Sequence, residues 1–132
     1  MRAVLLSLFV LILAGCSGSG ALIRQIDTTR PPSVYVEPMD GDGFGLQQKI
    51  ESYLAMRGYD PVSDPSKASM RLKARYQFAA TDTSATVRIT DAATGDSIYY
   101  GEGNNHGFGT LMNPGGAIFG CFERAMSDLP RR

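Results

Sequence analysis

The chain has 132 residues, of which 43% are hydrophobic, and its 13 basic residues balance its 13 acidic residues. A balanced charge creates no long-range field that would draw the protein to nucleic acid, so we expect no nucleic-acid partner. The length suits one small domain, and a domain of this size buries enough apolar surface for one modest core.

The first fifteen residues have the layout of a secretory signal. Arg2 precedes an apolar run over 3–14, and this run is shorter than the roughly 20 apolar residues of a membrane span. Residues 13–16, Leu-Ala-Gly-Cys, resemble the lipobox of bacterial lipoproteins, whose cysteine is acylated and becomes the first residue after cleavage. The resemblance implies that 1–15 is a lipoprotein signal peptide and that Cys16 carries the lipid that holds the protein on a membrane.

The residues after the predicted lipidation site indicate a location. Ser17 stands where inner-membrane lipoproteins of diderm bacteria carry an Asp sorting signal. This resemblance implies an outer-membrane lipoprotein that faces the periplasm. Residues 16–32 begin with Cys-Ser-Gly-Ser-Gly and end with Pro-Pro, so we expect a lipid anchor and a flexible tether. Residues 33–132 then form the single domain.

The start of that domain predicts a strand, a helix and a short extended segment. β-Branched and aromatic residues favour a strand over 33–37, and apolar residues at helical spacing favour a helix that begins near Leu46. Asp42 is placed to cap the start of this helix. Gly58 is placed to end it in a left-handed conformation, and 59–62 continue as an extended segment.

The second half of the domain alternates more strictly. Apolar and polar residues alternate over 70–78 and again over 85–90, which predicts two half-buried strands. A hairpin leads to a third strand near 98–100, the glycine-rich stretch 101–116 is expected to be a loop, and 117–129 form a helix that buries Cys121. The expected fold is α+β: a two-layer sandwich with a mostly antiparallel sheet of about four strands and two helices on one face.

The sequence lacks the combinations of residues that form a catalytic or metal site. His106 is the one histidine, and no nucleophile motif accompanies it. A zinc site needs several His or Cys ligands, which the mature chain does not contain. The glycine-rich segment 41–45 lies between a strand and a helix, but its spacing matches neither a phosphate-binding loop nor a calcium loop. We therefore expect a non-enzymatic protein without cofactor or metal.

A basic stripe is the first candidate for partner contact. Arg71, Lys73 and Arg75 point to one face of their strand, and Arg88 is expected to join them from the next strand. The stripe is either a solvated face that discourages pairing of strand edges or a contact surface for an acidic partner or an envelope polymer.

An apolar segment is the second candidate. Phe108, Leu111 and Met112 lie in the glycine-rich stretch. They either fold back onto the sheet or contact a protein or a membrane, because exposed apolar patches usually have partners.

A series of motifs runs from residue 33 to residue 78. It consists of Val-Tyr-Val at 34–36, Gly-Leu-Gln-Gln-Lys-Ile at 45–50, Gly-Tyr at 58–59 and Pro-Val-Ser-Asp-Pro-Ser-Lys-Ala at 61–68. This plan resembles the TraT family of outer-membrane surface-exclusion lipoproteins. More loosely, it is similar to the small α+β domain of curli-pore-type accessory lipoproteins. The resemblance implies a non-enzymatic role at the outer membrane, often as an oligomer.

Two functions follow from these features. The first is a lipid-anchored accessory or assembly factor for an outer-membrane secretion, conjugation, transport or surface-structure machine, with an envelope protein as its partner. The alternative is a self-assembling structural oligomer of the outer membrane, a homo-oligomer in which 108–112 supply the contact between copies.

Overall fold

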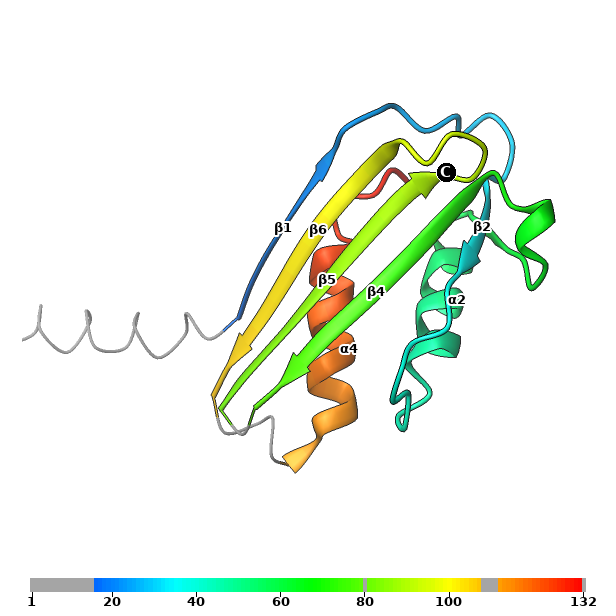
Figure 1. The fold of residues 1–132 in the computed structure, drawn as a ribbon. Coiled ribbons are helices and arrows are strands. Elements are labelled where there is room, and N and C mark those ends of the chain that lie inside the picture. The colour runs from blue at the N-terminus through cyan, green and yellow to red at the C-terminus, as the bar shows by residue number, and fades with distance from the viewer. Residues whose placement is uncertain (1–15, 80, 108–111, 132) are drawn as a thin grey trace, which may run out of the picture.

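The part of the chain that the structure describes folds into two layers, a six-stranded sheet and two α-helices that cover one of its faces (Figure 1). The computed structural model describes residues 16–79, 81–107 and 112–131. The elements in chain order are β1 (Cys16–Leu22), β2 (Ser33–Val36), α2 (Leu46–Met56), β3 (Asp60–Pro61), the 3₁₀-helix η1 (Pro65–Lys67), β4 (Met70–Phe78), β5 (Asp82–Asp91), β6 (Ser97–His106) and α4 (Pro114–Ala125). The predicted α+β class is confirmed.

The sheet is mixed, with the strand order β1-β6-β5-β4-β2-β3. Strands β1, β6, β5 and β4 are antiparallel neighbours, whereas β2 runs parallel to both β4 and β3. A parallel pair needs a crossover connection, and α2 lies in the connection between β2 and β4. The expected sheet of about four strands is corrected to six, because β1 and the two-residue β3 extend its two edges.

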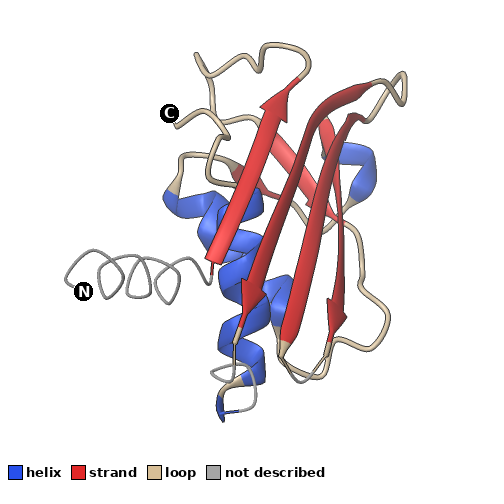
Figure 2. Cartoon of the chain, turned by 90° about the vertical axis from the view of Figure 1, so that its left-hand side faces the viewer, coloured by secondary structure: helices blue, strands red, loops and turns tan. Residues whose placement is uncertain are grey.

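Strand β1 departs most from the sequence-based expectation. Residues 16–32 are predicted to be a flexible tether, yet the chain pairs with β6 from Cys16, opposite Asn105, to Leu22, opposite Tyr99. Figure 2 is viewed from this edge of the sheet. The tether prediction is therefore wrong for β1. Glycine and serine have low strand propensity, so partner strand β6 and the helix behind it impose the extended conformation.

Glycines let helix α4 lie directly on β6. A Cβ atom on Gly101 would lie 1.8 Å from the carbonyl oxygen of Ala125, and one on Gly103 would lie 2.0 Å from that of Cys121. Only glycine allows the two backbones to approach so closely. The loop predicted over 101–116 is corrected accordingly, because β6 runs through its first part.

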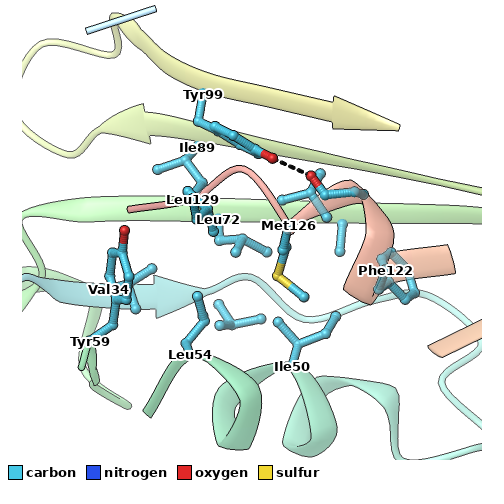
Figure 3. Close-up of a cluster of buried hydrophobic side chains, with 14 of the residues drawn as sticks. Val34, Ile50, Leu54, Tyr59, Leu72, Ile89, Tyr99, Phe122, Met126 and Leu129 are labelled. Atoms are coloured by element: carbon cyan, nitrogen blue, oxygen red, sulfur yellow. Dashed lines mark hydrogen bonds between the residues drawn. The ribbon is translucent and has the colours of Figure 1, made fainter. Parts of the chain in front are cut away.

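The core fills the space between the sheet and the two helices (Figure 3). The buried side chains of α2 are Leu46, Ile50 and Leu54, and those of α4 include Ile118, Cys121, Phe122 and Ala125. Each large apolar side chain that is fully buried contributes roughly 1.5–3 kcal/mol. The hydroxyl of Tyr99 donates a hydrogen bond to the carbonyl oxygen of Ala125 inside this core (Figure 3). The predicted burial of Cys121 is confirmed.

Side chains hold the ends of the helices. The Asp42 carboxylate accepts hydrogen bonds from the backbone N–H groups of Leu46 at 2.6 Å and Gln47 at 3.1 Å, which confirms the predicted cap of α2. Beyond the other end of α2, the Arg57 guanidinium donates to the carbonyl oxygen of Leu129, in the turn that follows α4. The C-terminal ends of the two helices are thereby tied together.

Because α4 contacts β6 so closely, a single methyl group added to β6 at this contact should lower the stability of the fold. We expect Gly103→Ala to lower the free energy of unfolding by about 1–3 kcal/mol, because the new Cβ overlaps the α4 backbone. The control is Gly43→Ala, at a position where a Cβ meets nothing within 4 Å. Urea denaturation of both variants measures the difference, and equal stabilities would refute the close-packing argument.

An ion pair beyond β1 predicts a pH effect. Arg24 Nη2 lies 2.5 Å from Asp91 Oδ2, and this hydrogen bond, with those from the Ala93 and Thr94 N–H groups, lowers the pKa of Asp91 to about 2. Because the pKa is lowered in the folded state, the stabilisation is present above pH 3.8 and is lost as the pH falls toward about 2.

In Arg24→Ala, we expect the pKa of Asp91 to rise toward its ordinary value without reaching it, because the two backbone donors remain. An NMR titration of the carboxyl carbon measures this pKa. Lys49→Ala, on the exposed side of α2, serves as the control. An unchanged pKa in Arg24→Ala would contradict the role of the ion pair.

Candidate partner-binding surface

Four basic side chains share the face of the sheet that the helices leave uncovered. Along β4, the residues that point toward the helices are buried, and Arg71, Lys73 and Arg75 alternate with them and are exposed. Arg88 of β5 lies directly opposite Lys73 and is also exposed. The structure thus brings together the four cations that the sequence singles out. We name this surface, formed by Arg71, Lys73, Arg75 and Arg88, the basic face.

The cations of the basic face have few internal partners. Arg71 Nη1 lies 3.9 Å from a carboxylate oxygen of Glu37, and its guanidinium lies 5.9 Å from the centre of the Tyr35 ring. Arg88 donates a 2.9 Å hydrogen bond to a serine hydroxyl. Among the described residues, the side chains of Lys73 and Arg75 form no hydrogen bond or ion pair. Among the described residues, only Arg71 of these four cations therefore has a carboxylate partner.

The register of β4 and β5 concentrates this charge. Like charges directly opposite each other in an antiparallel pair repel, and Lys73 faces Arg88 in this way. Arg71 lies two residues before Lys73 and Arg75 two residues after it, each roughly 6–7 Å away along the strand. The positive charge forms a row along β4 that an extended chain of acidic groups would match.

Two shallow hollows border the row of charges. One of about 300 Å³ lies between Glu37, Arg71, Lys73 and Arg88. The other, of about 860 Å³, lies between the segment that follows β2 and the far part of β4, and Lys73 and Arg75 form part of its wall. Both hollows are open and partly polar, which suits an extended acidic segment better than an enclosed small molecule.

The other predicted site residues lie away from the basic face. Cys16 is the first residue of β1. Met112 lies just before α4 and is exposed, so it does not fold back onto the sheet. Phe108 and Leu111 lie outside the described residues.

His106 ends strand β6. Its Nδ1 atom lies 3.0 Å from an oxygen of Asp82, and both side chains are more than half exposed. Across the described ranges, no group of three His, Cys, Asp or Glu side chains could hold a metal ion. In the same part of the chain, no helix is long and apolar enough to cross a membrane.

The sequence does not predict that two aromatic side chains are exposed. Phe78 continues the apolar side of the β4 alternation, which predicts burial, but its side chain is exposed. Phe44 follows the turn before α2 and is exposed as well. Tertiary packing decides which side chains near the ends of β4 and α2 are covered, and no local pattern in the sequence shows that.

Comparisons with known proteins place the fold. No family model and no curated protein matches the sequence. The PelC dodecamer from Paraburkholderia phytofirmans matches with a TM-score of 0.64 at 11% identity, over 89% of this chain and 99% of that chain. A DUF4136 family protein from Bacteroides thetaiotaomicron matches with a TM-score of 0.61 at 9% identity, over 86% of this chain and 95% of that one. At such identities the likeness shows a shared fold alone, and the TraT resemblance stays a prediction.

The repulsion within the basic face predicts a stabilising substitution. We expect Lys73→Gln to raise the free energy of unfolding by about 0.2–1 kcal/mol at low salt, because it removes the like charge opposite Arg88. The gain should shrink at high salt, which screens exposed charges. Lys49→Gln on α2 removes an exposed charge outside the basic face and is the control. Urea denaturation at two salt concentrations measures both, and a loss of stability in Lys73→Gln would contradict the argument.

Proposed function

We propose that this chain is a non-enzymatic lipoprotein, anchored through Cys16 in the outer membrane and facing the periplasm. There it serves as an accessory or assembly factor of a secretion, conjugation, transport or surface-structure machine. Its working surface is the basic face, which binds an acidic segment of an envelope protein. The TraT resemblance over 33–78 supports a machine of this kind.

The observation that carries the proposal is the uncompensated charge of the basic face. Lys73 and Arg75 form no side-chain hydrogen bond or ion pair with the described residues, and Lys73 faces another cation. Like charges that face each other across a strand pair repel and do not stabilise the sheet. An acidic partner would neutralise the row of charges and would be guided to it over a distance.

The anchor is supported by the sequence before β1. Residues 13–16 resemble a lipobox, and each buried methylene of an attached lipid contributes about 0.8 kcal/mol to membrane attachment. Several acyl chains on Cys16 would keep the protein at the membrane throughout its working life. A machine component that must stay beside its partners benefits from such an anchor.

Self-assembly is a second candidate, favoured by the comparison with PelC. That protein forms a dodecamer, and its whole chain is matched by this one. If copies of this chain meet through two different surfaces, the contact repeats until a ring closes. The two candidates are compatible, because a ring of copies would present several basic faces to one machine.

The role of the basic face predicts a selective loss of partner binding. We expect the combined change Arg71→Glu, Lys73→Glu and Arg75→Glu to abolish recovery of the partner, because it reverses the charge that attracts it. The measurement is affinity purification of the lipidated protein from cross-linked envelopes, followed by mass spectrometry.

The matched control reverses three exposed cations elsewhere, namely Lys49, Lys67 and Arg131. It changes the net charge equally but leaves the basic face intact, so the partner should still be recovered. Equal recovery with both triple variants would rule out the basic face as the contact surface. Light scattering in mild detergent tests self-assembly, and a monomer at high concentration would exclude the second candidate.

A further inference from the structure

A row of paired residues connects the predicted lipid site to an exposed aromatic side chain. Cys16 of β1 lies opposite Asn105 of β6, Asn105 opposite Thr83 of β5, and Thr83 opposite Phe78 of β4. Adjacent strands are about 4.8 Å apart, so three spacings place the backbone of Phe78 roughly 14 Å from that of Cys16. The first residue of β1 and the last residue of β4 therefore share one end of the sheet, which we name the Cys16 end.

Helix α4 also begins at the Cys16 end. Cys121 lies over Gly103 and Ala125 over Gly101, so α4 runs antiparallel to β6. Its first turn therefore lies near the end of β6, and Figure 1 shows the start of α4 beside the end of β4. Met112, which precedes the helix, is placed at this end and is 88% exposed.

A second aromatic residue lies in the same region. A Cβ built on Gly115, in the first turn of α4, would lie 3.2 Å from the ring of Phe44. The Phe44 side chain thus borders the start of α4, and it is 42% exposed, as Phe78 is 45% exposed. Phe44, Phe78 and Met112 present apolar surface to solvent at one end of the molecule.

Polar side chains also lie at this end. Asp82 and His106 flank the row of paired residues, and Asp82 Oδ1 lies 3.0 Å from His106 Nδ1. The Asp42 carboxylate, before Phe44, accepts hydrogen bonds from the N–H groups of Leu46 and Gln47. The boundary between headgroups and acyl chains accommodates polar groups beside apolar ones, and the three apolar side chains supply the attraction to it.

We propose that Phe44, Phe78 and Met112 insert into the surface of the bilayer that holds the Cys16 lipid. This inference rests on the anchor in the proposed function and adds the orientation of the domain. Amphipathic elements at membrane surfaces sink about 5–10 Å into the boundary between headgroups and acyl chains, which large apolar side chains favour. The sheet then stands with its strands pointing away from the membrane and its basic face turned sideways.

The position of Cys16 within β1 favours this orientation over a flat one. The chain is already paired with β6 at Cys16, so no flexible linker separates the predicted lipid from the folded domain. If the domain lay on its β1 edge, the unpaired N–H and C=O groups of that edge would enter the lipid, where they find no hydrogen-bond partners. The Cys16 end presents the side chains of Phe44, Phe78 and Met112 to the bilayer instead.

The opposite end of the molecule provides a matched control. Ile23 follows β1 and is 61% exposed, and Met56 ends α2 and is 80% exposed. Strand β1 leads away from Cys16, and Arg57 binds the turn after α4, so both residues lie at the far end. They are as apolar and as exposed as the residues at the Cys16 end, but the orientation keeps them in water.

Tryptophan fluorescence tests the orientation, because the sequence contains no tryptophan. Phe78→Trp, Met112→Trp and Ile23→Trp each introduce a single probe into the full lipidated protein. The proteins are reconstituted into phosphatidylcholine vesicles with brominated acyl chains, which quench tryptophan on contact. We expect Phe78→Trp and Met112→Trp to lose most of their emission and to shift to shorter wavelength. Ile23→Trp should keep the emission that it has in vesicles without bromine.

The outcomes separate the orientation from the anchor. Flotation with the vesicles and the mass of the Cys16 peptide report lipidation independently of fluorescence. If the protein floats and carries lipid but neither Phe78→Trp nor Met112→Trp is quenched, the orientation is wrong and the anchor stands. Equal quenching of Ile23→Trp also overturns the orientation. If the protein carries no lipid on Cys16, the proposed anchor fails and the orientation fails with it.

Discussion

The direct contact between helix α4 and strand β6 is the constraint on which the rest of this structure depends. At Gly101 and Gly103 the sheet has no side chains, and the helix backbone fills the space that they leave. The helix can then stay close to the sheet as far as β1. There a Cβ atom on Gly18 would clash with Arg124 of α4, and one on Gly20 would clash with Tyr99. Strand β1, in which four of seven residues are serine or glycine, has little strand preference of its own and is stabilised because β6 pairs with it and α4 covers it.

This arrangement would make the proposed anchor at Cys16 a rigid mount. A flexible tether would let the domain turn freely above the membrane, and its surfaces would have no fixed direction. With Cys16 already paired in the sheet, the proposed lipid site, the apolar side chains at the Cys16 end and the basic face keep constant relative positions. The proposed accessory role would use this property, because a partner would then meet the basic face at a defined height and angle.

The sequence predicts those parts of the fold that local chemistry decides. Alternation over 70–78 assigns each side chain of β4 to a face, so the grouping of Arg71, Lys73 and Arg75 follows from strand geometry alone. The cap at Asp42 also follows from local chemistry. Strand β1 and the end of β6 could not be predicted, because their conformation depends on a helix that follows later in the chain. The exposure of Phe44 and Phe78 likewise depends on how distant parts of the chain pack.

The basic face and the contact of α4 with Gly101 and Gly103 each contain residues that disfavour the fold locally. They differ in whether the rest of the chain offsets that cost. Glycines at 101 and 103 lower intrinsic strand preference, but the close packing of α4 offsets this cost within the folded chain. The pairing of Lys73 with Arg88 also opposes folding, yet no described carboxylate forms an ion pair with either side chain. Proteins retain locally unfavourable arrangements mainly at functional sites. This is the reason for our proposal that a partner, rather than the fold itself, supplies the charge that compensates the cations of β4.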